Sequence, residues 1–395
     1  MNSNISSVFS DIPALKDGLG HISFCADDKL AEDLDSEGHI DHHVRVAIRL
    51  RVEPVKAYRM ATLNPAVYYR LDHLIGSVTP GKLADLLILS NLEEVRYVFY
   101  RIRRIFSNDS SPSAVIVNGK LVAENNEALF ANTDKVPEFT RNTIHIHPDF
   151  LDPSAFHVKP LQGRNNAWVQ AVEMYDGYFK RAFHAKLQVS ISGYLKCDLE
   201  RDILKVVVID RHHYTRNCGI AFVRGFGLKR GAIACTTNCE NQNLVVIGTS
   251  DEEIAYAVKA IQHLGGGFVA VLNGDMVGAV KLDVAGCMSS EGWEKVRDDS
   301  LVCDDAVRNI LGGKIHAPFM IASFVGLVGV PDLGLTELGL VDCKTQGLMD
   351  VVLSDEIGED GSDLVPSSSR LFKICCRCPS HSHDVHRLMD KTNLV

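Results

Sequence analysis

The stretch that decides the fold of the C-terminal half is NLVVIGTSDEEIAYAVKAIQHLGGGFVAVLN, residues 243–273. Its centre predicts a helix, because Ser250 is a good N-cap, Glu253 follows three residues later as in a capping box, and glycines end the segment. An apolar run typical of a buried strand lies on each side of this helix. The stretch therefore predicts a strand, a helix and a second strand in succession.

Further strand-like runs surround this segment and extend the α/β pattern. DILKVVVID covers residues 202–210, and MVGAVKLDVAG covers residues 276–286. Asn273-Gly274 joins two apolar runs and is typical of a hairpin turn, since both residue types tolerate positive φ. We therefore expect a mixed α/β domain in this part of the chain.

The N-terminal part has a different pattern. LGHISFCAD predicts one buried strand that ends on two aspartates, Asp27 and Asp28. Helices are expected over residues 42–52, where apolar residues recur at helical spacing, and from Pro54 onward, since proline suits the first helical turn. One strand followed by helices is the repeating pattern of an α/β barrel. This part is therefore interpreted as the last β/α unit of a truncated TIM-like barrel.

The chain divides into four predicted parts. Asn118-Gly119 between two apolar runs predicts a hairpin, so we expect a small β-sandwich module with an inserted, arginine-containing loop. The last residues are rich in Ser, Asp and Gly and predict a disordered tail. The expected parts are the barrel remnant at 1–75, the β module at 76–141, the α/β domain at 142–353 and the tail at 354–395.

Composition and charge limit the classes of function. The chain has 395 residues, with 46% hydrophobic and 23% charged residues and a net charge of −9. This charge argues against broad nucleic-acid binding, which needs a basic surface. No apolar run reaches the roughly 20 residues of a membrane span, and the N-terminus lacks a secretory pattern. The eleven cysteines are too dilute for a disulfide scaffold, so a cytoplasmic protein is expected.

Asp27 is the first candidate for chemistry. A carboxylate at the C-terminal end of a barrel strand lies on the face where such barrels place their active sites. Without further information, a cap and turn before the next helix is the favoured alternative for a pair of aspartates. His145 and His147 share one face of an extended segment and are geometrically able to share a metal, although coincidence is favoured there.

The predicted tail carries a dense group of thiols and imidazoles. Such a density suits zinc or copper, but the spacing matches no common structural zinc motif. The favoured interpretation is a disordered tail whose cysteines and histidines were not selected for a function, and a metal-binding tail is the alternative. The residues are Cys375, Cys376, Cys378, His381, His383 and His386.

Several longer segments are specific enough to indicate a family. They are FCADDKLAEDLDSEGHIDHHVRVAIRL, PVKAYRMATLNPAVYYRL, GSVTPGKLADLLIL, VNGKLVAEN, RHHYTRNCGIAFVRGFGLKRGAIA, NLVVIGTSDEEIAYAV and LGGGFVAV, and they span roughly residues 20–353. In this order they resemble the C-terminal two-thirds of adenine deaminase, a metal-dependent member of the amidohydrolase superfamily. RGFGLKRGAIA, at residues 224–234, is a long and specific match.

The resemblance implies a reaction and a site. The expected reaction is hydrolytic deamination of adenine to hypoxanthine and ammonia by water that a divalent metal activates. Manganese is the expected metal, with iron or zinc as alternatives. In the family, the aspartate that ends the eighth barrel strand binds metal and transfers the proton. By its position in FCADD, Asp27 corresponds to this aspartate and is the expected catalytic residue and metal ligand.

The chain also departs from the family pattern. Most barrel strands are expected to be missing, and one carboxylate cannot replace a set of three or four ligands. At residues 239–242, Cys-Glu-Asn-Gln stands where the family commonly has His-Asp-Ser-His. His212 and His213 match the family, but neighbouring side chains on a strand point to opposite faces. At most one of these two histidines is therefore expected to face a site.

Two functions remain open at this point. The first is adenine deamination, with the rest of the barrel supplied by a homo-oligomer or by another polypeptide. The alternative is a catalytically inactive remnant that serves as an assembly or regulatory module.

Overall fold

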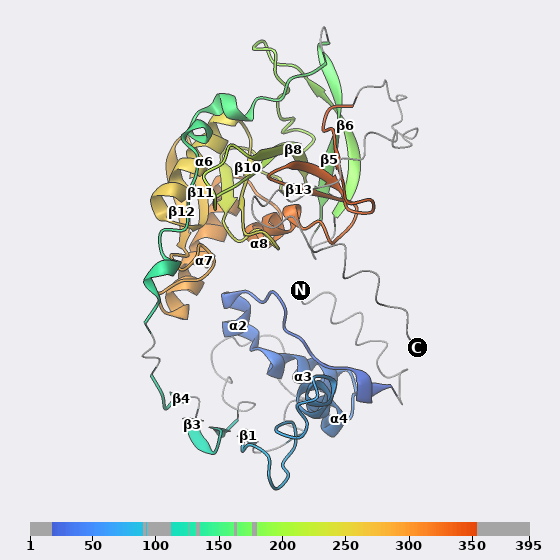
Figure 1. Cartoon of the computed structure of the whole chain (residues 1–395), viewed down its shortest axis with the longest axis vertical. Helices are drawn as coiled ribbons and strands as arrows, with labels where there is room; N and C mark the ends of the chain where they lie inside the picture. The colour runs from blue at the N-terminus through green and yellow to red at the C-terminus, as the bar shows by residue number, and fades with distance from the viewer. Residues whose placement is uncertain are drawn as a thin grey trace, which may run out of the picture.

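The computed structural model describes residues 18–89, 92, 112–125, 127–131, 135–161, 164–175 and 180–353. Figure 1 shows an N-terminal region, which runs to residue 131, and a C-terminal domain, which begins at residue 135. Most of the predicted arginine-containing loop and the whole predicted tail, with its cysteines and histidines, lie outside the described residues.

The C-terminal domain is built on one eight-stranded sheet of order β12-β11-β9-β10-β7-β8-β5-β6. Neighbouring strands pair antiparallel, except that β5 and β8 are parallel. The strands are β5 (Asn166–Met174), β6 (Lys180–Gln188), β7 (Leu204–Ile209), β8 (Cys218–Arg224), β9 (Ala232–Cys235), β10 (Leu244–Gly248), β11 (Gly267–Leu272) and β12 (Asp275–Lys281). The predicted mixed α/β fold is confirmed.

The predicted central helix is α6 (Asp251–Leu264). Ser250 caps it, since its side chain accepts a hydrogen bond from the backbone N of Glu253 at 3.3 Å, and Gly265 ends it with φ 81°. Glu253 does not complete the capping box. Its Oε1 accepts from the backbone N of Asn273 at 2.9 Å, which ties the helix to the hairpin after β11.

The strands on either side of α6 are not direct neighbours in the sheet. β9 lies between β10 and β11 and is antiparallel to both. The hairpin from β11 to β12 turns at the predicted pair, Asn273 with φ 54° and Gly274 with φ 89°. The sequence therefore predicted β10, α6 and β11 correctly. It did not predict that β9 lies between the two strands, because this placement depends on pairing with residues outside the segment.

Both faces of the sheet are covered, which explains why β7 and β10 are buried at every position. One face packs against α6 and the 3-10 turns Pro148–Leu151 and Pro153–Phe156. The other face packs against a second group of elements. These are α7 (Trp293–Asp305), α8 (Pro318–Ser323) and a small sheet of β13 (Leu333–Thr336), β14 (Gly339–Asp342) and β15 (Gly347–Met349).

The RGFGLKRGAIA segment joins β8 to β9 and is framework. The carboxylate of Asp202 accepts hydrogen bonds from the backbone N of Gly225 at 2.9 Å and of Gly227 at 2.7 Å. A Cβ on Gly225, which has φ 110°, would lie 2.2 Å from the carbonyl oxygen of Met174. Glycine is required there by both the backbone conformation and the close approach of β5.

The strand predicted over residues 19–27 is wrong. Leu19–His21 form a 3-10 turn, and the extended backbone that follows pairs with no strand among the described residues. The backbone N of Phe24 instead donates to the carbonyl oxygen of Met60 on a helix, at 3.0 Å. A barrel strand needs a neighbouring strand to bond its backbone groups, and no strand lies beside this segment within the described residues.

The predicted helices of the N-terminal region are confirmed. They are α3 (Ile40–Arg49), then α4 (Pro54–Ala61) and α5 (Leu63–Tyr68), which divide the second predicted helix, and they follow a short α2 (Ala31–Glu37). Pro54 is the first residue of α4, as expected. Val44, Ile48 and Met60 form a small core between α3 and α4. No sheet of the described residues closes into a barrel.

The β module is one antiparallel sheet of β1 (Leu86–Ile88), β2 (Ala114–Val117), β3 (Lys120–Glu124) and β4 (Glu127–Ala128). The predicted hairpin turn is confirmed, since Asn118 has φ 48° and Gly119 has φ 76°. The predicted sandwich is not formed by the described residues. These strands are two to five residues long and largely exposed, which leaves little apolar area to bury a second layer.

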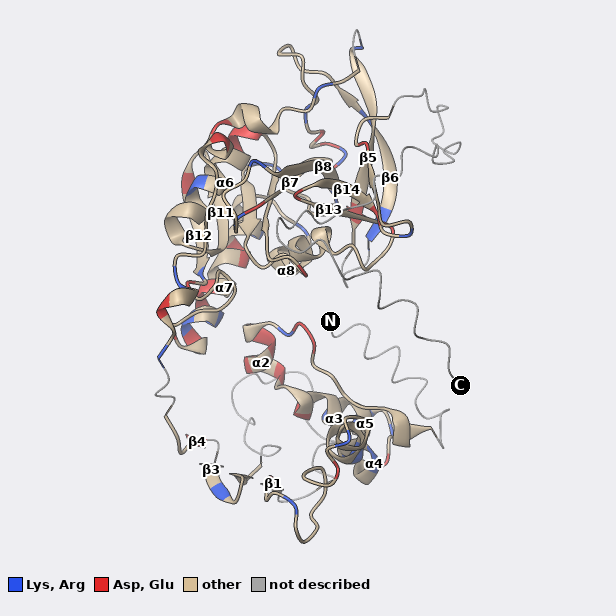
Figure 2. Cartoon of the chain, in the orientation of Figure 1, with Lys and Arg blue, Asp and Glu red and all other residues tan. Residues whose placement is uncertain are grey.

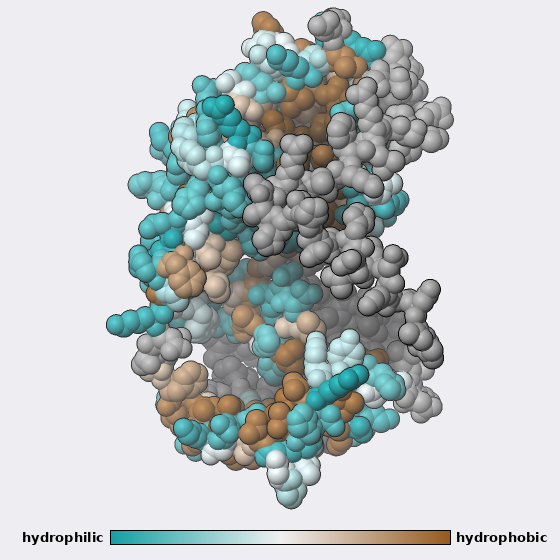
Figure 3. Space-filling view, viewed as in Figure 1, coloured by the Kyte–Doolittle hydropathy of each residue, from teal (hydrophilic) through white to brown (hydrophobic). Residues whose placement is uncertain are grey.

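The N-terminal region leaves a run of apolar side chains on its surface. Tyr68 is 77% exposed and Val78 is 87% exposed, and Val67, Tyr69 and Leu71 are also exposed. Figure 3 shows hydrophobic side chains on the surface over this region, in the lower part of the view. Within the described part of the chain, none of the helices combines the length and the apolar character that a bilayer span requires.

Candidate functional site

Asp27 lies where the extended segment turns toward α2. It is exposed and has φ 51°, a conformation that Asp adopts more readily than most residues. The segment before it is held by His43, whose Nε2 lies 3.0 Å from the carbonyl oxygen of Cys25. The backbone N of Lys29 donates to the carbonyl oxygen of Asp27 at 2.9 Å. These contacts fix the backbone on both sides of the carboxylate.

Asp28 is the immediate partner of Asp27. Burial raises the pKa of Asp28, and the charge of Asp27 and a hydrogen bond between the two side chains raise it further. Two carboxyl groups in contact cannot both ionise without repulsion, so the pair retains a proton to a higher pH than a single aspartate. The pair is therefore able both to accept and to donate a proton.

Across from this pair lies a loop of the C-terminal domain, residues 236–243, which follows β9. The backbone N of Cys239 donates to the carbonyl oxygen of Ser323 at 3.1 Å, and the two side chains are 3.5 Å apart. Burial raises the pKa of the Cys239 thiol, and the charges of Asp28 and Asp27 contribute to the same rise. The two segments that the sequence analysis singled out, FCADD and the loop with the altered family run, therefore lie within electrostatic reach of each other.

Arg211 anchors this loop from beneath. The side chain is buried, with 1% exposed, and it donates to four carbonyl oxygens on three separate segments. The acceptors are Gln242, Thr143 at 3.2 Å, Thr236 at 3.4 Å and Ala285 at 3.0 Å. A buried arginine with several carbonyl acceptors fixes the relative positions of the segments that carry them.

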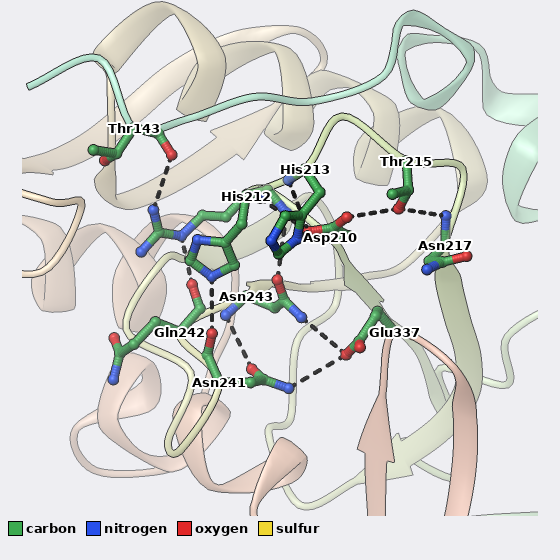
Figure 4. Close-up of polar contacts among 11 residues, drawn as sticks. Thr143, Asp210, His212, His213, Thr215, Asn217, Asn241, Gln242, Asn243 and Glu337 are labelled. Atoms are coloured by element: carbon green, nitrogen blue, oxygen red, sulfur yellow. Dashed lines mark hydrogen bonds and ion pairs between the residues drawn. The ribbon is translucent and has the colours of Figure 1, made fainter. Parts of the chain in front are cut away.

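A polar network surrounds the anchor (Figure 4). His212 Nε2 lies 2.8 Å from the carbonyl oxygen of Asn241, and the carboxylate of Glu337 accepts from Asn243 Nδ2 at 2.9 Å. His213 is largely exposed and lies 3.5 Å from Asp210. Only His212 faces the loop, as expected, but the reason differs: both histidines lie on a turn after β7 and not on a strand.

Lys180, which the sequence analysis did not single out, lies beneath the same loop. It is buried, and its Nζ donates to the carbonyl oxygens of Phe324 and Leu327. Burial lowers the pKa of Lys180 to about 8, against the opposing charges of Cys343, Glu240 and Cys239. The lysine therefore holds the 324–327 turn and supplies a positive charge beside the loop.

The described residues do not assemble a metal site. No three His, Cys, Asp or Glu side chains among them come together in a way that would hold an ion. His145 is exposed, and His147 accepts from the backbone N of Asp149 at 3.3 Å and lies against Tyr214. One carboxylate pair does not provide the three or more ligands that a catalytic metal needs.

Comparison with known families covers both regions of the chain. The amidohydrolase family matches residues 2–122, and the adenine deaminase C-terminal domain matches residues 178–347. Both matches occur in the order in which the two regions follow each other here. The chain is a homologue of the adenine deaminases.

Individual adenine deaminases are similar over most of the chain. The enzyme of Desulforamulus reducens is 36% identical over 338 residues, which is 85% of this chain and 54% of that protein. The enzymes of Dehalococcoides mccartyi, strain CBDB1, and Clostridium botulinum, strain Loch Maree, are also 36% identical and match 82% and 81% of this chain. These matches cover 52% and 50% of the two relatives. The chain thus spans about half the length of the curated relatives it matches.

Sequence reasoning missed two members of the site. The sequence showed Asp28 but gave no sign that its side chain contacts that of Asp27, because the alternation of a strand would have sent the two side chains apart. Lys180 carries no sequence signal at all, since it lies at the start of an edge strand that was not predicted. Its burial arises from the packing of the 324–327 turn against β6.

Proposed function

We propose that this adenine deaminase homologue takes part in the hydrolytic deamination of adenine to hypoxanthine and ammonia, with Asp27 as its catalytic carboxylate. The observation that carries the proposal is the position of the Asp27–Asp28 pair opposite the loop at 236–243. Homology to adenine deaminases over most of the chain supplies the reaction and the substrate class.

The proposed chemistry needs one group that accepts and returns a proton. Water adds to C6 of adenine, and the amino group at C6 leaves as ammonia after it gains a proton. Asp27 takes the proton from the water and delivers it to the leaving amine. Asp28 lies beside Asp27, and burial followed by the charge of Asp27 raises its pKa, so this carboxyl gives up its proton at a higher pH than an isolated aspartate does.

We propose that a divalent metal is part of the complete site, with Asp27 as one ligand. Manganese is the proposed ion, because carboxylate ligands suit it, and iron or zinc are alternatives. The described residues do not hold a metal by themselves. The remaining ligands must therefore come from outside them.

We further propose that the complete site forms when other barrel strands join the N-terminal region, from a homo-oligomer or from another polypeptide. The exposed apolar side chains of residues 67–78, and the extended segment before Asp27, which joins no sheet of the described residues, are surfaces that such strands would cover. The eight described cysteines are free thiols, which agrees with a cytoplasmic location. Adenine is the proposed substrate, and no nucleic-acid or membrane partner is proposed.

A second candidate is an assembly or regulatory module without catalysis. The structure of the C-terminal domain supports this candidate, because the domain has a buried core of its own on each face of its sheet. Such a domain has the burial expected of a fold that does not depend on the N-terminal region. This candidate predicts specific association with an amidohydrolase barrel and no contribution of Asp27 to turnover.

Ammonia release from adenine tests the first proposal. The full chain is assayed alone and together with the first half of the Desulforamulus reducens enzyme, with manganese, iron or zinc added in parallel. We expect metal-dependent release that falls by at least about 100-fold in Asp27→Asn. Asp72→Asn, which alters an exposed aspartate of the same region, is the matched control and should retain the wild-type rate. Turnover that Asp27→Asn does not reduce would refute the assigned role, and no turnover in any mixture would favour the second candidate.

A further inference from the structure

The extended segment before Asp27 is hydrogen-bonded to helices. Figure 2 shows α3, α4 and α5 in the lower part of the view, below α2, and α4 contacts both α3 and α5. Asn64 on α5 is 6% exposed, and its Nδ2 donates to the carbonyl oxygens of Leu19 and Ile22, each at 2.7 Å. A buried amide with two backbone acceptors fixes the start of the segment. A helix therefore supplies donors that a neighbouring strand would supply in a sheet.

His43 on α3 holds the carbonyl of Cys25, two residues before Asp27. A carbonyl oxygen only accepts hydrogen bonds, so the 3.0 Å contact of this oxygen with His43 Nε2 requires a proton on Nε2. Burial lowers the pKa of His43, which keeps the ring neutral at pH 7. In the neutral ring, Nδ1 then carries no proton. The contact therefore fixes one tautomer of His43.

The two nitrogens of the His43 ring have different surroundings. His43 is 3% exposed, and its Nδ1 is buried and has no hydrogen-bond partner among the described residues. The ring packs edge-on against Phe24, with 5.9 Å between the ring centres. Burial of an unpaired nitrogen costs free energy that a phenylalanine ring at the same position would avoid. The bond to the Cys25 carbonyl is the contact that an imidazole makes here and an apolar ring does not.

We propose that His43 is a positioning residue of the proposed site, which holds the carbonyl of Cys25 and thereby fixes the backbone from which the side chains of Asp27 and Asp28 project. His43 acts through this backbone and not on the substrate. Two residues of extended chain span at most about 7 Å, so a shift of the Cys25 carbonyl carries over to Asp27. Loss of the donor should therefore move the carboxylates without removing a group that binds adenine.

The effect of His43 on turnover rests on the proposed function. Its effect on the order of the segment does not, because this order is measured without adenine or metal. The two effects are therefore tested separately.

Two substitutions separate donation by His43 from packing. His43→Phe keeps an aromatic ring against Phe24 but removes the donor, whereas His43→Gln keeps an N–H donor at a similar reach but removes the ring. His73→Phe, at an exposed histidine of the same region, is the matched control. A donor role predicts that His43→Gln behaves as the wild type and that His43→Phe does not. A packing role predicts the reverse and would overturn the proposal.

Hydrogen exchange of the full chain measures the order of the segment. The amide of Phe24 donates to the carbonyl oxygen of Met60 at 3.0 Å, so its protection reports whether the segment stays on the helices. We expect protection of residues 22–29 to fall by about tenfold in His43→Phe. Protection should stay within about twofold of the wild type in His43→Gln and in His73→Phe, and protection of α3 should be unchanged in all variants.

Three results of the exchange experiment would overturn the proposal. The first is equal protection of the segment in the wild type and in His43→Phe. The second is an equal loss in His43→Phe and in His43→Gln. The third is a loss in His43→Phe that extends over α3, since His43 would then support the folding of its own helix.

The ammonia assay measures the effect on turnover. His43→Phe should lower kcat by about tenfold with KM within about twofold of the wild type, and His43→Gln should recover most of kcat. A higher KM with an unchanged kcat would place His43 in substrate binding and overturn its positioning role. If Asp27→Asn leaves turnover unchanged, the proposed function fails, whereas the exchange experiment still decides whether His43 orders the segment.

Discussion

The C-terminal domain and the N-terminal region differ in how their extended segments are paired. Every residue of β7 is buried, and the strand has a neighbour on each side. The segment before Asp27 is extended as well, but it lies against a helix, and its residues alternate between exposed and half-buried up to Ala26. An extended segment thus becomes a strand only where neighbouring strands satisfy its backbone hydrogen bonds, and the position of the proposed catalytic aspartate at its end depends on the same neighbours.

The largest effect is expected from the buried arginine of the C-terminal domain. Arg211→Leu leaves several buried carbonyl oxygens without a donor and should lower the free energy of unfolding by about 4 kcal/mol. Thermal unfolding of the full chain measures this loss. Arg216→Leu, at an exposed arginine paired with Asp149, is the control and should change stability by less than about 0.5 kcal/mol. Equal effects of the two variants would mean that the anchor does not hold the loop.

The next effect should be confined to the N-terminal region. Met60→Ala removes a fully buried side chain from the small core of α3 and α4 and should cost about 3 kcal/mol locally. Hydrogen exchange should show lost protection in residues 40–68, with the melting temperature of the C-terminal domain unchanged. Val55→Ala, on the exposed side of α4, is the matched control. A shift of the C-terminal transition would show that the two regions unfold together.

A smaller effect is expected at the start of α6. Ser250→Ala removes the acceptor for the backbone N of Glu253 and should lower the stability of the C-terminal domain by about 1 kcal/mol. Ser250→Asn keeps an acceptor and should differ from the wild type by only a few tenths of a kcal/mol. Denaturant titrations compare the three chains, and equal losses in both variants would argue against the cap.

The smallest effect on stability is expected from the ion pair between Asp283 and Arg141. Hydrogen bonds from Ser290 and the nearby Arg141 lower the pKa of Asp283 to about 2, against the effect of burial. Because this pKa is depressed, the ionised carboxylate stabilises the fold above its usual pKa, and the stability is lost as the pH falls from about 4 to 2. Acid titration of Asp283→Asn should show a flatter loss over this range, by less than about 1 kcal/mol. An acid profile identical to the wild type would contradict the ion pair.

The sequence predicted the elements whose pattern is local. The cap and glycine end of α6, the two Asn-Gly hairpins and the buried runs of β7 and β10 depend on residues close together in the chain. Each of these signals has a direct physical cause. The Asn-Gly turns need positive φ, and the first backbone N–H groups of a helix need a side-chain acceptor. The mixed α/β class followed from them.

The features that the sequence did not predict depend on distant residues. β9 enters the sheet between β10 and β11, and β5 and β6 form its far edge without a clear sequence pattern. The segment before Asp27 has the composition of a strand but no strand beside it among the described residues. Asp27 lies opposite Cys239 because the N-terminal region contacts the C-terminal domain. The spacing of residues within either region does not predict this contact.

The position of the Asp27–Asp28 pair opposite the loop at 236–243 is the central claim, and the reactivity of Cys239 tests it most directly. Because the two carboxylates contribute to the raised pKa of Cys239, Asp28→Asn should lower this pKa. Alkylation by iodoacetamide at pH 8, followed residue by residue by mass spectrometry, should then be several-fold faster at Cys239, with Cys343 as the internal control. An unchanged rate at Cys239 would place the pair away from the loop and contradict the account.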